Sequence, residues 1–145
     1  MAVRTVTTQS EDDTAALGRE LAATLSAGDV LLLSGDLGAG KTAFVRGLAE
    51  GLGVSRDEVS SPTFTLIQEY RGGRLTLFHV DLYRIDDARE FDELGLDEIA
   101  EDGVLAIEWA ERLPAPPAHA IRISIEHAGE FERRIVLEKS TKYEV

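Results

Sequence analysis

One stretch near the start of the chain has the residue types and spacing of a phosphate-binding loop. Residues 35–42 read Gly-Asp-Leu-Gly-Ala-Gly-Lys-Thr and fit the pattern G-x-x-x-x-G-K-[ST]. Glycines allow a tight turn that points backbone N–H groups at phosphate oxygens, and the helix that follows directs its positive end at the same anion. The stretch therefore predicts a nucleoside triphosphate site. The alternative is a glycine-rich turn with an exposed lysine.

Within this loop each residue has an expected part. Lys41 can reach the β- and γ-phosphates, and the Thr42 hydroxyl can join the shell of a Mg²⁺ ion. The residues expected to surround the phosphates are Gly35, Asp36, Leu37, Gly38, Ala39, Gly40, Lys41 and Thr42.

Two carboxylates are candidates for holding that metal ion. Asp81 ends the run Leu-Thr-Leu-Phe-His-Val, and Glu108 ends the run Val-Leu-Ala-Ile. Both stand where an apolar strand becomes a polar loop, and ligands of open α/β sheets bind at such strand ends. We predict catalytic and metal-binding roles for both. The alternatives are a helix cap or a salt bridge to Arg84 for Asp81, and an ordinary surface acid for Glu108.

Other polar and aromatic residues carry weaker signals. Ser61, Thr63 and Thr65 lie where P-loop switches place hydroxyl groups that sense the γ-phosphate, although Ser-Pro-Thr is also an ordinary turn. Trp109 is the only tryptophan, and a lone aromatic is usually in a core or an interface. His79 is interpreted as a packed strand residue.

The elements that must position these residues alternate between strand and helix patterns. The apolar run 30–33 predicts a strand buried on both faces. Ser10 is a helix N-cap for a helix that Gly28 ends, and residues 44–52 form the helix after the loop. The remaining expected elements are a weak strand at 3–7, a hairpin at 63–80 around Gly72-Gly73, an acidic helix at 90–100, a strand at 104–107 and a terminal hairpin at 121–137 in which Phe131, Arg133, Ile135 and Leu137 alternate.

Together these elements predict an α/β fold of the P-loop NTPase type, in one domain over residues 1–145. Its sheet is mixed, with a parallel core and antiparallel hairpin additions, and helices cover both faces. A length of 145 residues with 43% hydrophobic residues is enough to form a core.

Charge and cysteine content restrict the function further. The formal net charge is −12, and nucleic-acid affinity depends mainly on lysine and arginine, so we do not expect this chain to bind RNA or DNA alone. The absence of cysteine excludes disulfides and thiolate metal sites. Residues 1–13 have no apolar signal core, and no stretch has transmembrane length. We therefore expect a cytoplasmic protein without a membrane partner.

Four motif blocks together resemble one family. They are the loop 35–42, Ser-Pro-Thr-Phe-Thr-Leu at 61–66, His-Val-Asp-Leu-Tyr-Arg at 79–84 and Ile-Glu-Trp at 107–109. In order and spacing the chain is similar to the TsaE family from about residue 10 to residue 109. The resemblance implies a small bacterial P-loop ATPase required for threonylcarbamoyladenosine (t6A) modification of tRNA. It implies ATP and Mg²⁺ as ligands, and a TsaB–TsaD heterodimer as partner, with the chain itself a monomer.

The resemblance also implies residue roles. Residues 38–43 would wrap the phosphates, with Ala43 standing where a second threonine is common, while Thr42 and Glu108 match the Mg²⁺ positions. Asp81 matches a Walker-B-like acid, residues 61–65 a nucleotide-sensing switch, and Trp109 an aromatic beside the pocket. From the terminal hairpin, Arg133 or Arg134 would reach the nucleotide, and residues 8–11 would contact adenine. The ATPase activity would be weak alone and would reset the partner complex between turnovers.

Three other functions remain as alternatives. A nucleotide-binding scaffold or switch with negligible turnover would show the same motifs. A small-molecule kinase would need an acceptor site and usually an arginine-bearing lid, and the segment after Asp81 is acidic. A GTPase would need a guanine-reading Asn-Lys-x-Asp, which the sequence lacks.

Overall fold

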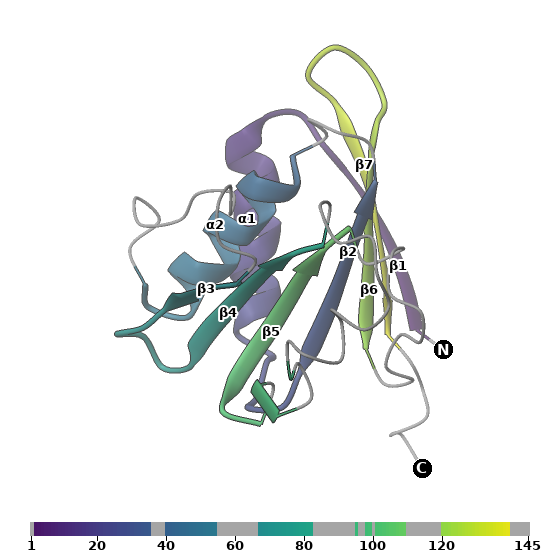
Figure 1. Cartoon of the computed structure of the whole chain (residues 1–145). Coiled ribbons are helices and arrows are strands. Elements are labelled where there is room, and N and C mark those ends of the chain that lie inside the picture. The colour runs from purple at the N-terminus through teal and green to yellow at the C-terminus, as the bar shows by residue number, and fades with distance from the viewer. Residues whose placement is uncertain are drawn as a thin grey trace.

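The computed structural model describes residues 2–35, 40–54, 67–82, 95, 98–99, 101–109 and 120–139. These residues form one seven-stranded sheet and two helices (Figure 1). The elements in chain order are β1 (Ala2–Thr8), α1 (Glu11–Ala22), β2 (Val30–Gly35), α2 (Lys41–Gly51), β3 (Ile67–Tyr70), β4 (Thr76–Asp81), β5 (Gly103–Glu108), β6 (Ile121–His127) and β7 (Arg133–Lys139).

The sheet has the strand order β1-β7-β6-β2-β5-β4-β3. Its four central strands, β4, β5, β2 and β6, run parallel. The first four residues of β2 are buried, as the continuous apolar run predicts for a strand covered on both faces. The predicted parallel core is therefore confirmed, and it includes the first strand of the terminal hairpin.

Antiparallel strands extend the sheet on both sides. At one edge β3 pairs with β4 across the predicted Gly72-Gly73 turn. At the other edge β7 pairs with both β6 and β1. The predicted hairpin additions are thus confirmed, but Phe131 is not a strand residue: it lies in the β6–β7 turn with 69% of its surface exposed. The predicted alternation holds for the apolar residues Ile135 and Leu137, which are buried in β7.

Helix α1 begins as predicted and ends earlier. The Ser10 side chain accepts a hydrogen bond from the Asp13 backbone N–H, which satisfies one of the free donors of the first turn. The helix ends at Ala22 rather than near Gly28. Leu25 continues the apolar stripe and is buried, but it lies outside the helix, because a burial pattern does not distinguish helix from the packed chain that follows.

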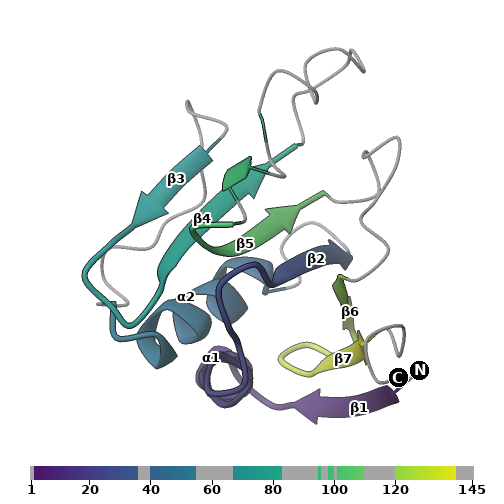
Figure 2. The ribbon, with the colours of Figure 1, turned by 90° about the horizontal axis from the view of Figure 1, so that it is seen from below.

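Both helices lie against the same face of the curved sheet (Figure 2). They touch backbone to backbone through glycines. A Cβ atom at Gly47 would lie 1.8 Å from the Ala15 carbonyl oxygen, and one at Gly18 would lie 2.4 Å from the Phe44 carbonyl oxygen. Since no larger residue fits at either position, the glycines fix how closely the two helices approach.

The far ends of the two helices are also joined. The Arg74 guanidinium, in the β3–β4 turn, donates hydrogen bonds to the carbonyl oxygens of Ala22, the last residue of α1, and of Leu25 beyond it. The Arg74 backbone N–H donates to Leu52 O at the end of α2. The β3–β4 hairpin therefore holds both helix C-termini.

The sheet separates two apolar clusters. The larger one lies between the sheet and the helices, and the smaller one includes Val30, Leu32, Val80 and Ile107 on the opposite face. The helix predicted at 90–100, which would cover that second face, lies outside the described residues except for Gly95 and residues 98–99. Ile99 packs against the smaller cluster. Within the described ranges, no helix combines the length and apolar character needed to cross a membrane.

Candidate functional site

The candidate site lies at the edge of the sheet where β2, β4 and β5 end and α2 begins. Two glycines of the sequence motif bracket the loop there. Gly35 ends β2 with a φ of 132°, and Gly40 precedes α2 with a φ of 104°. Both angles lie in the left-handed region that favours glycine. The loop residues between them, Asp36, Leu37, Gly38 and Ala39, lie outside the described residues.

Lys41 occupies the first position of α2 and is not an exposed lysine. Only 5% of its surface is exposed. Its Nζ donates to the Gly35 carbonyl oxygen at 3.3 Å and lies 3.9 Å from the centre of the Trp109 ring. No carboxylate pairs with Lys41 among the described residues. The alternative of a solvent-exposed turn lysine is therefore wrong, and a buried positive charge stands at the start of the helix.

The two predicted acids stand side by side. Asp81 and Glu108 are register partners at the ends of the parallel strands β4 and β5, and the Leu82 N–H donates to Glu108 O at 3.2 Å. Side chains alternate along a strand, and Ala106, two residues before Glu108, packs in the cluster on the helix side. Both acids therefore face the side of the sheet on which α2 begins.

Trp109 follows Glu108 with an unusual backbone. Its φ of 61° is the one positive φ of a non-glycine residue in the described part of the chain. Such angles cost energy and cluster at functional sites. The turn brings the indole ring under the Lys41 ammonium, and the ring also packs against the smaller apolar cluster.

His79 contacts Glu108, which the sequence did not predict. The imidazole is fully buried, and its Nε2 lies 2.5 Å from Glu108 Oε2. His79 Nδ1 is a buried atom with no partner among the described residues. The interpretation of His79 as a packed strand residue is confirmed by its burial in β4, but it did not include this contact. The available signal was its position two residues before Asp81, which places both side chains on one face of the strand.

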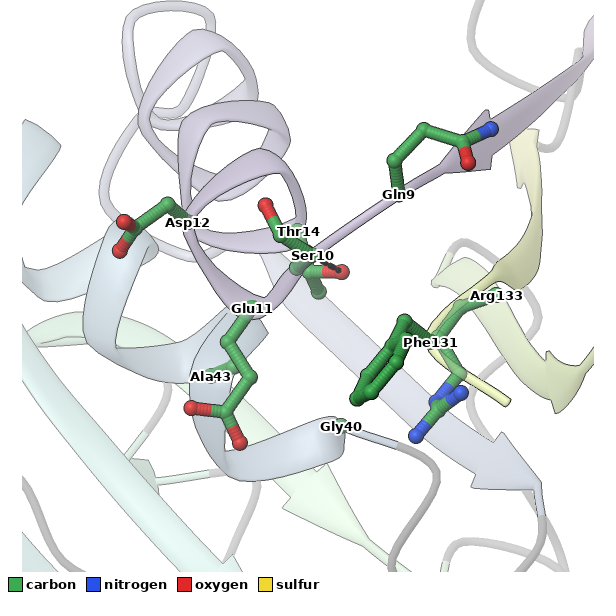
Figure 3. A pocket seen from close by; sticks show the side chains of 9 residues that line it. All are labelled: Gln9, Ser10, Glu11, Asp12, Thr14, Gly40, Ala43, Phe131 and Arg133. Atoms are coloured by element: carbon green, nitrogen blue, oxygen red, sulfur yellow. Dashed lines mark hydrogen bonds between the residues drawn. The ribbon is translucent and has the colours of Figure 1, made fainter. Parts of the chain in front are cut away.

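A cleft of about 600 Å³ adjoins the start of α2. Figure 3 shows that it lies between the N-termini of α1 and α2 and the turn of the β6–β7 hairpin. Its lining combines polar, charged and aromatic groups: Gln9, Ser10, Glu11, Asp12, Thr14, Gly40, Ala43, Phe131 and Arg133. The cleft therefore joins the phosphate-loop helix to residues from both ends of the chain.

The cleft distinguishes Arg133 from Arg134, between which the sequence did not decide. Arg133 lines the cleft, while Arg134 pairs with Glu126 at 2.6 Å on exposed surface. Residues 9–11 line the cleft, whereas Thr8 is buried and hydrogen-bonded to Thr14. The contribution of Phe131 was missed, because no local pattern shows that the hairpin turn meets the start of α1.

The remaining predicted residues fall in two groups. Thr42 lies half-buried in the first turn of α2, and Ala43 follows it, buried and lining the cleft. Ser61, Thr63, Thr65 and Arg84 lie outside the described residues, so the predicted switch remains a prediction.

The donor set at this edge fits Mg²⁺ bound jointly with a phosphate. Mg²⁺ uses one or two carboxylates together with water and substrate phosphate oxygens. Asp81 and Glu108 supply two adjacent carboxylates, and Thr42 supplies a hydroxyl from the helix that follows the loop. No cluster of three or more histidine and acidic side chains suited to a metal occurs in the described ranges.

Comparison with known proteins identifies a family and several relatives of this chain. The profile of the family described as "Threonylcarbamoyl adenosine biosynthesis protein TsaE" matches residues 8–135. The TsaE protein of Bacillus subtilis is 48% identical over 130 residues, which cover 88% of this chain and 80% of that protein. The TsaE protein of Treponema pallidum is 42% identical over 131 residues, covering 89% of this chain and 96% of that protein.

Structural similarity agrees with the sequence comparison. The crystal structure of Bacillus subtilis YdiB superposes with a TM-score of 0.77 at 39% identity, covering 99% of this chain and 90% of that one. The family profile spans the phosphate loop, both acids and Arg133. The resemblance seen in the four motif blocks is thus confirmed, and the family match extends over residues 8–135. The chain belongs to the TsaE family.

Proposed function

We propose that this chain is the Mg²⁺-dependent ATP-binding and ATP-hydrolysing subunit of tRNA threonylcarbamoyladenosine biosynthesis. Its family and the names of its relatives support the pathway. One observation supports the chemistry above all others. The Lys41 ammonium at the start of α2 and the in-register pair of Asp81 and Glu108 converge on one edge of the sheet.

The phosphate chain of ATP binds at the start of α2. Gly40 offers no side chain to the first turn, and that turn contains no acidic residue, so the positive end of the helix is open to an anion. Lys41 adds a charge that is already held beside the Gly35 carbonyl at the entrance of the loop.

The base and ribose extend into the cleft between the two helices and the β6–β7 turn. Phe131 offers an aromatic face, and Arg133 offers a planar guanidinium (Figure 3). Both groups stack on a nucleobase. Glu11 and Asp12 supply acceptors for hydroxyl or amino groups on the ligand.

Hydrolysis transfers the γ-phosphoryl group of ATP to water and releases ADP and phosphate. Asp81, Glu108 and Thr42 would hold Mg²⁺, and the bound ion would neutralise charge on the phosphate oxygens. Lys41 stabilises the same oxygens from the helix side. Buried surroundings strengthen these interactions, because both Lys41 and Glu108 are only 5% exposed and the local dielectric is low.

The protein acts through a partner rather than on RNA directly. A net charge of −12 disfavours contact with a phosphate backbone, and the same charge suits a basic docking surface. We propose that the partner is the TsaB–TsaD heterodimer, that the chain alone is a monomer with weak activity, and that it works in the cytoplasm, where tRNA is modified.

An ATPase assay with and without TsaB–TsaD tests this proposal. The expected result is slow Mg²⁺-dependent release of phosphate by the chain alone and a severalfold increase when the pair is added. GTP replaces ATP in a parallel arm, and Lys41→Ala is the inactive control. The same assay without added acceptor separates hydrolysis from kinase activity, because a kinase needs its phosphoryl acceptor.

Two results would sink the proposal in different ways. ATP binding measured by calorimetry without turnover, alone and with the pair, would make the chain a nucleotide-binding scaffold or switch. Phosphoryl transfer to a small molecule in preference to water would make it a kinase.

A further inference from the structure

His79 of β4 and Glu108 of β5 form a polar contact inside the sheet. His79 is fully buried, and the Glu108 side chain is 6% exposed. The register partner of His79 is Ala106, not Glu108. The small Ala106 side chain lies opposite the imidazole, which reaches diagonally to the Glu108 carboxylate two residues further along β5.

A packing role alone would not require a histidine at this position. The neighbouring residues Leu77, Phe78 and Val80 are apolar and buried. Burial of a polar group costs free energy unless it is hydrogen-bonded, and His79 Nδ1 has no partner in the described part of the chain. A leucine would avoid that cost. Among the described residues, the one hydrogen-bond partner of the ring is a proposed metal-binding carboxylate.

The direction of this hydrogen bond follows from its partners. A carboxylate oxygen accepts and a ring N–H donates, so we assign the tautomer that has its proton on His79 Nε2. The bond occupies Oε2 of Glu108 and fixes the plane of the carboxylate. The other oxygen, Oε1, remains for a ligand.

We propose that His79 is a positioning residue, which holds Glu108 through Nε2–H so that the carboxylate is already oriented for the metal of the bound nucleotide. The inference rests on the proposed function of Glu108 and adds to it. Loss of a group that hydrogen-bonds to a metal ligand and orients it typically lowers metal affinity or activity by about 10- to 100-fold. Without this hydrogen bond, Glu108 must be ordered each time the metal binds.

Two substitutions separate positioning from packing. His79→Leu fills the site without a donor, and His79→Gln keeps an N–H donor near the place of Nε2. The readouts are the Mg²⁺ concentration for half-maximal ATP hydrolysis and the dissociation constant for ATP measured by calorimetry without metal. We expect His79→Leu to raise the Mg²⁺ requirement about 10- to 100-fold, with metal-free ATP binding unchanged, and His79→Gln to recover most of that loss.

The controls exclude general damage. His127→Gln changes an exposed histidine of β6 and should leave the Mg²⁺ requirement at the wild-type value. Thermal unfolding of each variant reports folding. If His79→Leu fails to fold, His79→Gln and His79→Asn carry the comparison, because asparagine is too short to place its N–H at Nε2.

A second readout needs no activity. The chain has three histidines, so ¹⁵N-labelled imidazole signals can be assigned by substitution. In the ligand-free protein His79 should carry its proton on Nε2, and Glu108→Gln should shift that signal. A proton on Nδ1 alone would overturn the inference.

The results distinguish this inference from the proposed function. If wild-type protein neither binds nor hydrolyses ATP, the proposed function fails. If the wild type is active but His79→Leu keeps its Mg²⁺ requirement, or loses metal-free ATP binding equally, then His79 only packs and the inference fails.

Discussion

The N-termini of α1 and α2 lie beside the same cleft and are built in opposite ways. Helix α1 is closed by its own residues: the Ser10 side chain caps it, and Glu11, Asp12 and Asp13 place negative charge in its first turn. Helix α2 begins after Gly40, has no side-chain cap and no acid in its first turn, and starts with Lys41. One positive helix end is satisfied internally, and the other is left for an anion.

For the proposed nucleotide, this contrast favours phosphate binding at α2 over α1. Two helix ends of similar dipole would compete for a phosphate group, and the cap with its three acids removes α1 from that competition. The glycine contacts between the helices keep both ends at a fixed distance from each other. The cleft thus has an uncapped helix end without acidic residues at α2 and an acidic side at α1.

Removal of the positive charge at α2 should have the largest effect. Lys41→Ala leaves a helix end without its ammonium and should lower ATP turnover by roughly 100- to 1,000-fold, as for other groups that stabilise transition-state charge. Phosphate release measures it. Lys139→Ala, at an exposed position in β7, is the matched control. Turnover unchanged in Lys41→Ala would remove α2 from the catalytic site.

Separation of the two helices should be the next largest effect. Gly47→Ala places a Cβ only 1.8 Å from the Ala15 carbonyl oxygen, so the helices must move apart. Overpacking of this kind lowers the free energy of unfolding by about 1–3 kcal/mol. Urea denaturation measures this loss. As control, Gly129→Ala meets nothing closer than 3.6 Å, and an equal loss in both variants would contradict a special role for the contact.

Opening the cap of α1 should cost less. Ser10→Ala removes the acceptor of the Asp13 N–H and should lower the free energy of unfolding by about 1 kcal/mol. The urea midpoint reports the change. Ser10→Asp keeps an acceptor at the cap and should retain stability. If alanine and aspartate behave alike, the cap is not what closes α1.

Substitution of the arginine that lines the cleft should have the smallest effect, and this effect is on ATP affinity. Arg133→Gln removes a guanidinium that lines the cleft and should weaken ATP binding by about two- to fivefold, the value of a partly exposed stacking contact. Arg134→Gln, which breaks an exposed ion pair with Glu126, should leave the affinity unchanged. Calorimetry on both variants decides between them, and a reversed order would assign the nucleotide contact to Arg134.

Local sequence signals predicted the part of the site that is local in the chain. The loop flanks, the start of α2 and the two strand-end acids each depend on a few neighbouring residues. Gly35 and Gly40 have the left-handed angles that the motif requires, and Asp81 and Glu108 end parallel strands that pair in register.

Other features depend on distant pairing and could not be predicted. The cleft forms because β1 pairs with β7, which brings residues near the start of the chain to Phe131 and Arg133. The hydrogen bond between His79 and Glu108 requires the register of β4 on β5. The early end of α1 at Ala22 was missed because Leu25 is buried although it is not helical.

The position of Trp109 beneath Lys41 gives the protein an optical reporter of its own state. The indole is the only one in the chain, and the ammonium lies 3.9 Å from its ring centre. A charge at that distance shifts the energy of the indole excited state. When a phosphate draws Lys41 away, the emission of this one fluorophore should change in wavelength and intensity, so an unlabelled sample would report its own occupancy in real time.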